Sequence, residues 1–267
     1  MRFKKFLLLS MAAVLAASLC FSAFRSPYTP LLTAHRGNSA LCPENTLAAF
    51  RSAVRQGAGC VELDVRRTAD GVPVILHDEN LLRTTGDSRN VGSVCWREVR
   101  RMDAGSWFSP AFSGERIPSL AEVLVWARAS GIHLSVECKD PDPALVRRVV
   151  TLIRQSRMER RCLLASWDYE TLRQSKFLCS GLSTVLLAER LPSDVTHLVC
   201  ADGIGLPVES AAPAVSAQIH GCGKALHVWT VNTAEEVAAM LALHADNLIT
   251  DDPALCTAVL AARSASE

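Results

Sequence analysis

Residues 60–65 read Cys60-Val61-Glu62-Leu63-Asp64-Val65. An apolar run of this length is typical of a buried strand, and its two carboxylates are two residues apart, so on a strand they project from one face. Glu137 and Lys139 have the same spacing at the end of another apolar run. Burying several carboxylates beside a sheet core is costly unless a cation or basic group compensates them. These stretches predict a divalent metal site with a phosphate-sized anion nearby.

Short apolar runs alternate with longer amphipathic segments along most of the chain. Strands are predicted at residues 31–34, 60–65, 72–76, 132–136, 162–165, 183–187, 197–201, 225–231 and 247–250. Helices are predicted at residues 44–56, 120–130, 143–157, 169–178, 208–220, 233–243 and 253–262. This alternation favours an α/β fold of parallel strands joined by crossover helices, and a closed TIM (β/α)₈ barrel uses the number of units naturally.

The length and charge of the chain narrow its class. A single barrel fits the 267 residues, and we expect it to occupy residues 26–267. Residues 78–118 have little helical periodicity and are too long for a simple loop, so we expect a small insertion over one mouth of the barrel, after the second strand region. With 28 basic and 27 acidic residues, the chain has no general basic surface for nucleic acid. Any anion site must be local.

The N-terminus has the composition of a targeting segment. Basic residues in the first five positions precede an uncharged stretch at residues 6–24, which is intermediate between a signal peptide and a minimal membrane-spanning helix. We expect residues 1–25 to be a signal peptide or membrane anchor, with the rest of the chain outside the cytoplasm, either anchored or secreted. None of the ten cysteines forms a Cys-x-x-Cys pair, so mostly free thiols are expected.

Ionisable side chains gather where the predicted strands end. Barrel enzymes work at the C-terminal ends of their strands, and this set falls there: His35, Glu62, Asp64, His77, Glu137 and Lys139. The three carboxylates offer hard oxygen ligands for Mg²⁺ or Ca²⁺. The two histidines could exchange protons on either side of a phosphorus centre. Arg36 and Lys139 could neutralise phosphate oxygens, or could pair with the carboxylates instead.

The order of these motifs resembles the glycerophosphodiester phosphodiesterase family. The resemblance runs through His35-Arg36-Gly37, Pro43-Glu44-Asn45-Thr46, Glu62-Leu63-Asp64-Val65, Asp70-Gly71-Val72-Pro73-Val74, His77-Asp78, Arg83-Thr84-Thr85-Gly86, Ile117-Pro118-Ser119-Leu120, Glu137-Cys138-Lys139, Trp229-Thr230-Val231-Asn232 and Ile249-Thr250-Asp251. It covers nearly the whole chain beyond the N-terminal segment. The resemblance implies a TIM barrel with an insertion after the His77 strand.

The resemblance also implies a role for each candidate side chain. It implies acid–base catalysis by His35 and His77, and one divalent cation held by Glu62, Asp64 and Glu137. It implies phosphate contacts from Arg36 and Lys139. Glu44 would support His35 or Arg36, and Trp229 would form a wall of the pocket. The chain departs from the family pattern at Cys42, Cys138 and Asn247. These departures concern packing more than chemistry.

The activity implied is metal-dependent hydrolysis of small glycerophosphodiesters to glycerol 3-phosphate and an alcohol, with no obligate protein partner. One alternative is a lysophospholipase D or phospholipase acting on membrane lipids, for which Trp107, Phe108 and Phe112 in the insertion could supply an apolar groove. A second alternative is a non-catalytic, anchored binder of phosphorylated polyols. Complete histidine and carboxylate sets favour turnover over binding alone.

Overall fold

The computed structural model describes residues 30–264. The predicted signal peptide or anchor at residues 1–25 lies outside the described residues. Among residues 30–264, no helix combines the length and apolarity that a bilayer crossing requires.

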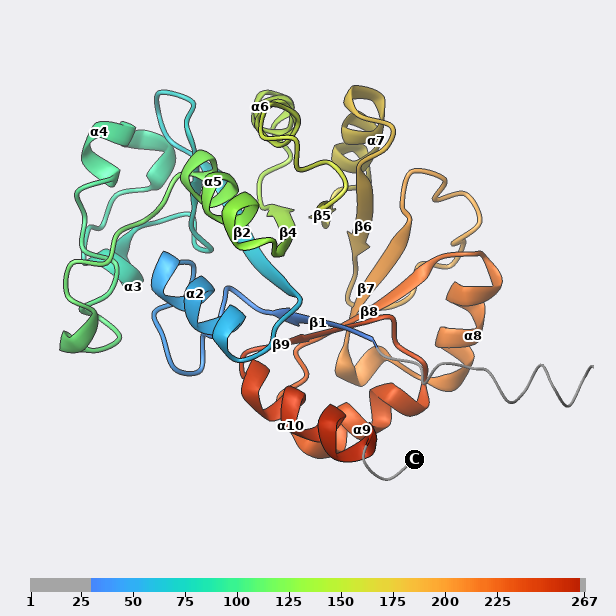
Figure 1. The fold of residues 1–267 in the computed structure, drawn as a ribbon. Helices are drawn as coiled ribbons and strands as arrows, with labels where there is room; N and C mark the ends of the chain where they lie inside the picture. The colour runs from blue at the N-terminus through green and yellow to red at the C-terminus, as the bar shows by residue number, and fades with distance from the viewer. Residues whose placement is uncertain (1–29, 265–267) are drawn as a thin grey trace, which may run out of the picture.

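Within the described residues, eight parallel strands close into a barrel, which confirms the predicted TIM fold (Figure 1). They are β1 (Leu31–Ala34), β2 (Cys60–Arg67), β4 (His133–Cys138), β5 (Cys162–Ser166), β6 (Ser183–Leu187), β7 (Gly203–Pro207), β8 (Ala225–Trp229) and β9 (Asn247–Thr250). The barrel closes at β1, where Ala34 pairs with Val61 of β2 on one side and with Thr250 of β9 on the other. The short β3 (Pro73–Ile75) pairs antiparallel with the outer part of β2.

Helices surround the barrel and cover its outer face (Figure 1). They are α2 (Leu47–Arg55), α5 (Leu120–Ser130), α6 (Pro143–Gln155), α7 (Tyr169–Leu178), α8 (Pro213–Gly221), α9 (Ala234–Ala242) and α10 (Pro253–Ser264). Because both faces of the strands are covered, β2 is buried along six consecutive residues. Side-chain caps begin α2, α5, α6, α7 and α9, with capping boxes at Ser119 and Thr233, whereas α8 has no such cap. The main core lies between these helices and the barrel.

The segment at residues 78–118 is separate from the barrel and lies beside α2 and α5 (Figure 1). It contains α3 (Leu82–Thr85), α4 (Trp96–Val99) and two short 3₁₀ turns, η1 (Val91–Ser93) and η2 (Pro110–Phe112). A second small core holds it together: Val74, Leu76, Leu81, Val91, Val94, Val99, Ala104 and Ile117. This core includes Val74 of β3 and Leu76 directly after it, so the segment is packed against the strand that leads to His77.

The prediction of a strand at residues 197–201 is wrong, because this stretch forms turns and β7 follows it at Gly203–Pro207. The apolar residues of the turn do not indicate burial, since Val199 is 77% exposed. The sequence of β7 does not predict a strand because it contains Gly203 and Gly205, and glycine is uncommon in strands. A Cβ on Gly205 would lie 2.6 Å from Leu187 Cδ2, so β7 needs glycine where a neighbouring side chain fills the barrel.

Two predicted helices begin later than expected. The helix expected at residues 44–56 starts at Leu47, after a cap at Thr46. The helix expected at residues 208–220 is divided into a 3₁₀ turn, η3 (Val208–Ser210), and α8, because Pro213 restarts the chain at a first-turn position.

The turn after β1 has an unusual backbone. Arg36 and Gly37 both have positive φ, at 55° and 87°, and Asn45 follows with φ 59°. A Cβ on Gly37 would lie 2.7 Å from the Ala49 carbonyl carbon, so the turn approaches the first helix too closely for any other residue. This close approach fixes the position of the turn that carries His35 and Arg36.

We predict that Gly37→Ala lowers the free energy of unfolding by about 1–3 kcal/mol more than Gly71→Ala does, because overpacking adds to backbone strain. Gly71 is a matched control, since its φ is also positive, at 81°, but nothing lies within 4 Å of the Cβ position. Urea denaturation of the two variants measures the difference. Equal losses of stability would contradict the close approach at Gly37.

Candidate active site

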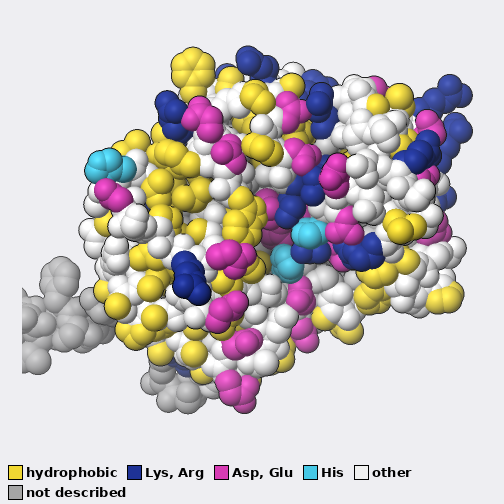
Figure 2. Space-filling model, turned by 180° about the vertical axis from the view of Figure 1, so that it is seen from behind, with side chains coloured by type: hydrophobic (Ala, Val, Ile, Leu, Met, Phe, Trp, Pro, Cys, Tyr) yellow, Lys and Arg dark blue, Asp and Glu magenta, His cyan; other side chains and the backbone are white. Residues whose placement is uncertain are grey.

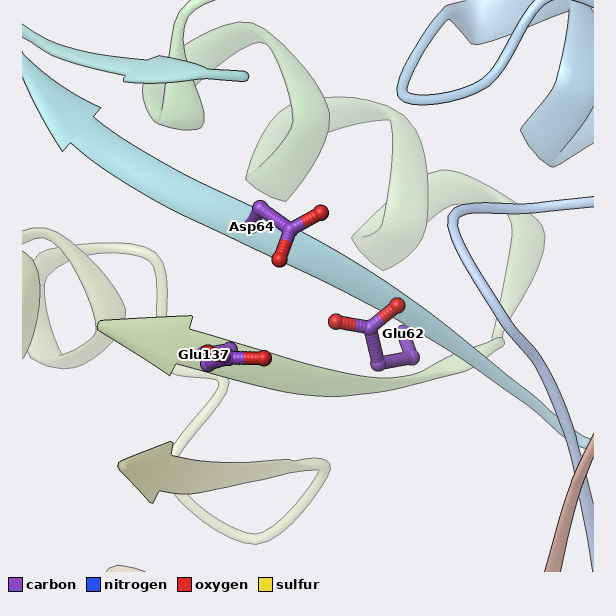
Figure 3. Close-up of side chains that lie close together, drawn as sticks. All are labelled: Glu62, Asp64 and Glu137. Atoms are coloured by element: carbon purple, nitrogen blue, oxygen red, sulfur yellow. The ribbon is translucent and has the colours of Figure 1, made fainter. Parts of the chain in front are cut away.

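Three buried carboxylates lie together near the C-terminal ends of two neighbouring strands. Glu62 and Asp64 project from β2 and Glu137 from β4, and the strand register sets Asp64 beside Glu137. Carboxylate oxygens of the three lie within 4.8 Å of one another, and Figure 3 shows the side chains gathered over β2 and β4. The three residues are only 5%, 1% and 8% exposed. Oxygen donors in this arrangement could hold a hard divalent cation.

The three carboxyl groups differ in proton affinity. Burial and the charge of Asp64 raise the pKa of Glu62 to about 8, and the same two causes raise the pKa of Glu137. Burial also acts to raise the pKa of Asp64, but the charges of Arg36 and Lys139 outweigh it and lower that pKa. Glu62 Oε1 is buried and has no hydrogen-bond partner. The cluster therefore contains an acceptor that its own residues leave unsatisfied, which fits a bound cation.

Asp64 is held by one amide and two basic side chains. Asn45 Nδ2 donates to Asp64 Oδ2 at 2.8 Å, and Asn45 Oδ1 accepts from the Asp64 amide at 3.3 Å. Arg36 Nε lies 3.4 Å from Asp64 Oδ2. Lys139 Nζ lies 3.5 Å from Asp64 Oδ1 and 2.8 Å from Glu137 Oε1. Both basic residues pair with carboxylates, and both also line the cavity beside the cluster.

His35 follows β1 and is held by a carboxylate from the far end of the chain. Its Nδ1 lies 2.7 Å from Asp251 Oδ1, and Asp251 also accepts from Ser39 Oγ at 2.8 Å and Asn232 Nδ2 at 2.7 Å. Burial acts to lower the pKa of His35, but the hydrogen bond to Asp251 and the charge of Glu62 outweigh it and raise that pKa. With Nδ1 held in this way, Nε2 is the ring nitrogen left for a ligand.

His77 follows β3 and has the same kind of partner. Its Nδ1 lies 2.8 Å from Asp78 Oδ1. Asp78 in turn accepts hydrogen bonds from Arg83, from Nε at 2.7 Å and from Nη2 at 3.1 Å. The backbone oxygen of His77 accepts from Arg66 Nε at 2.8 Å. Each predicted catalytic histidine is therefore oriented through Nδ1 by an aspartate.

Glu44 contacts Arg36 and has no hydrogen bond to His35. Arg36 Nη1 donates to Glu44 Oε1 at 3.0 Å, and the Arg36 amide donates to Glu62 Oε2 at 2.8 Å. Arg83 donates to both Glu44 oxygens, at 2.7 and 2.8 Å. Burial acts to raise the pKa of Glu44, but the hydrogen bonds from Arg83 and the charge of Arg36 lower it. Glu44 is therefore ionised and supports Arg36.

A cavity of about 230 Å³ brings these groups together. Its polar side is lined by His35, Arg36, Glu62, His77, Glu137 and Lys139. Figure 2 shows the corresponding hollow, with histidine side chains among basic and acidic ones, on the face opposite the view of Figure 1. The cavity thus collects both predicted catalytic histidines, a third histidine, His227, both basic residues and two of the three carboxylates, while Asp64 does not line it.

The other side of the cavity is apolar and aromatic. It is lined by Ala165, Trp167, Val185, Leu187, Trp229 and Ile249. Trp229 lies on this side, and its ring meets that of Trp167 edge to face with centroids 5.7 Å apart. Trp107, Phe108 and Phe112 are not among the lining residues, because they pack edge to face on one another within the insertion.

A model of the glycerophosphoryl diester phosphodiesterase family matches residues 35–255 of this chain. The chain belongs to this family. A glycerophosphodiester phosphodiesterase of Caldanaerobacter subterraneus subsp. tengcongensis is 33% identical over 233 residues, which cover 84% of this chain and 94% of that protein. The phosphodiesterase of Oleispira antarctica, solved in complex with the product sn-glycerol-3-phosphate, has a TM-score of 0.79 at 26% identity, covering 87% of this chain and 97% of that one.

Further members of the family have the same fold. A structure of a putative glycerophosphoryl diester phosphodiesterase from Silicibacter pomeroyi superposes with a TM-score of 0.80 at 25% identity, covering 89% of this chain and 95% of that one. In the chain described here, the region that matches the family model begins at His35, which is also the first residue to line the cavity.

Sequence reasoning missed the residues that hold the candidate groups. Asp251 and Arg83 occur in the motifs quoted for the resemblance, but no role was assigned to them. Asp78 is recognisable in the sequence as the charged neighbour of His77, and the structure adds the hydrogen bond between them. The pairing of His35 with Asp251 spans 216 residues, so no local spacing indicates it.

We predict that a divalent cation stabilises this family member more at pH 8 than at about pH 5. The raised pKa of Glu62 favours its protonated form in the folded protein, so this proton contributes stability below the ordinary pKa, and the contribution is lost as pH rises through about 8. A cation binds the ionised carboxylates and compensates for this loss. Thermal unfolding with and without Mg²⁺ or Ca²⁺ at each pH measures the effect.

The neutral variant Glu62→Gln provides the control, because it removes one of the two carboxyl groups with a raised pKa but keeps the side-chain shape. Its cation-induced rise in Tm should depend on pH less than that of the unmodified protein. An equal rise at both pH values in the unmodified protein would show that these carboxylates do not bind the ion.

Proposed function

We propose that this protein is a metal-dependent phosphodiesterase that hydrolyses glycerophosphodiesters to glycerol 3-phosphate and an alcohol. The observation that carries the proposal is the meeting of three kinds of group in one cavity: paired basic residues, two aspartate-held histidines and a buried carboxylate cluster. A phosphodiester needs its negative charge neutralised, one proton removed and one proton supplied. Each of these needs has a candidate group here, and membership of the family supports the same reaction.

Glu62, Asp64 and Glu137 would hold one divalent cation, Mg²⁺ or Ca²⁺. When bound, the cation supplies Lewis-acid polarisation of the phosphate and lowers the pKa of the adjacent glycerol hydroxyl. The donor set consists of oxygens alone, which suits both ions and disfavours ions that prefer thiolate or imidazole. Arg36 and Lys139 orient the phosphate from the polar side of the cavity, Arg36 by a planar fork and Lys139 as a point charge.

The two histidines exchange protons with the reacting groups. Asp251 and Asp78 accept from Nδ1 of His35 and His77, which leaves each Nε2 to give or take a proton at the cavity. One histidine removes the proton of the attacking hydroxyl or water, and the other protonates the departing alcohol oxygen. Attack by the glycerol hydroxyl gives a cyclic phosphate, whereas attack by water gives glycerol 3-phosphate directly.

The lining of the cavity favours a small diester over a lipid. A second hollow of about 560 Å³ shares His35 and Arg36 with the cavity of about 230 Å³, and its lining is almost entirely polar, which does not suit an acyl chain. The aromatic residues of the insertion, which were the proposed lipid groove, pack on one another instead of lining the cavity. The wall at Trp167 and Trp229 suits the carbon skeleton of a short alcohol.

We also propose that residues 6–24 hold the protein at a membrane, or direct its export, with the barrel outside the cytoplasm. The proposal rests on the basic residues at the start of the chain and on the uncharged stretch that follows them. A water-soluble substrate is supported separately, by the polar lining of the site.

We predict that His35→Ala and His77→Ala each lower turnover of glycerophosphocholine by about 10²-fold or more, the usual scale for acid–base catalysis. His197→Ala is a matched control, because this histidine is exposed and pairs with Asp194 away from the cavity. Release of glycerol 3-phosphate, with and without a chelator, measures the effect. Near-normal turnover in either variant would remove that histidine from the mechanism.

We predict that the full chain, reconstituted in vesicles, hydrolyses glycerophosphocholine in solution but leaves lysophosphatidylcholine in its own bilayer largely intact. The variant lacking residues 1–25 serves as the control, since it should have the same preference without any membrane. Faster hydrolysis of the lysolipid by the anchored protein would favour the alternative of an enzyme acting on membrane lipids.

A further inference from the structure

Arg83 connects the insertion to two parts of the candidate active site, although it does not line the cavity itself. It belongs to the short helix α3 at the start of the insertion. One edge of its guanidinium donates to both oxygens of Glu44, at 2.7 and 2.8 Å. A second edge donates to both oxygens of Asp78, at 2.7 and 3.1 Å. A single planar group therefore holds two carboxylates in a fixed relation.

Each of these carboxylates holds a group that faces the substrate. Asp78 Oδ1 lies 2.8 Å from His77 Nδ1, and Glu44 Oε1 accepts from Arg36 Nη1 at 3.0 Å. Two chains of hydrogen bonds thus diverge from Arg83. One ends at a histidine that exchanges protons and the other at an arginine that orients the phosphate.

Two features of the insertion restrain Arg83. Leu81, directly before α3, is fully buried in the small core of the insertion. The ring of Trp107 lies beneath the Arg83 guanidinium, 5.7 Å from its centroid. Arg83 remains 40% exposed, and ion pairs that exposed contribute little to the free energy of unfolding. The ion pairs of Arg83 therefore contribute more to the placement of Glu44 and Asp78 than to the stability of the fold.

We propose that Arg83 is a positioning residue that sets His77 and Arg36 relative to each other, so that catalysis depends on the insertion being docked. The proposal rests on the proposed phosphodiesterase function. Arg83 does not need to touch the substrate. Its effect passes through Asp78 to His77, which exchanges protons, and through Glu44 to Arg36, which binds the phosphate.

The test compares Arg83→Met with Arg83→Lys and Arg89→Met. The methionine keeps much of the side-chain length but removes all donors, while lysine keeps the charge but cannot hold two carboxylates as a planar fork. Arg89 is a matched control in the same insertion: it is 47% exposed and its guanidinium pairs with Asp87 and Glu98, away from the cavity. Thermal unfolding of all three variants checks that they remain folded.

Two readouts separate positioning from a purely structural role. We expect Arg83→Met to lower kcat on glycerophosphocholine by about 10-fold or more, but to cause little further loss in a His77→Ala background, because the arm through Asp78 then has no function. We also expect glycerol 3-phosphate to inhibit Arg83→Met several-fold more weakly, because Arg36 is less well held. Arg83→Lys should recover only part of either effect, and Arg89→Met should behave as the unmodified protein.

Several results would overturn the proposal. These are a kcat within about twofold of the unmodified protein, an equal proportional loss in both His77 backgrounds, or unchanged inhibition by glycerol 3-phosphate. Failure of the proposed function is distinct, because the unmodified protein would then hydrolyse no glycerophosphodiester and no comparison of variants could be made.

Discussion

The burial of three neighbouring carboxyl groups is the constraint on which the site depends. Glu62, Asp64 and Glu137 lie on neighbouring strands with almost no exposure to water, where charges of the same sign are costly to place together. The protein compensates part of this cost with Arg36 and Lys139, which outweigh burial at Asp64 and lower its pKa. At Glu62 and Glu137 burial and the charge of Asp64 prevail and raise the pKa, so these two carboxyl groups leave a role for a bound cation.

The barrel supplies the geometry that makes this cluster possible. Parallel pairing of β2 and β4 sets Asp64 opposite Glu137, and the alternation along β2 puts Glu62 on the same face. Closure of the barrel at β1 brings His35 beside them, and the positive φ angles of Arg36 and Gly37 turn the chain directly after it. Strand register and one tight turn therefore account for most of the positions of the candidate groups.

A layer of supporting side chains then fixes orientation. Asp251 holds His35, Asp78 holds His77, and Asn45 holds Asp64. These partners restrict the rotation of the side chains that bind the ion or exchange protons. The same principle explains why Arg83 can matter to a reaction whose substrate it does not touch.

The sequence predicted the barrel, most of its strands and the convergence of the carboxylates, because alternation and strand ends are local patterns. It did not predict the strand at β7, since Gly203 and Gly205 carry no apolar signal and their role is to make room for neighbouring side chains. It also missed the pairing of His35 with Asp251, which depends on closing a barrel across 216 residues. Contacts that arise only from closure have no signature in local spacing.

The central claim is that the three carboxylates bind one ion together, and an anomalous difference map from crystals grown with Mn²⁺ tests it most directly. The account predicts a single strong peak about 2–2.6 Å from an oxygen of each of Glu62, Asp64 and Glu137. A map with no peak among these oxygens, or with the ion bound elsewhere in the cavity, would contradict it.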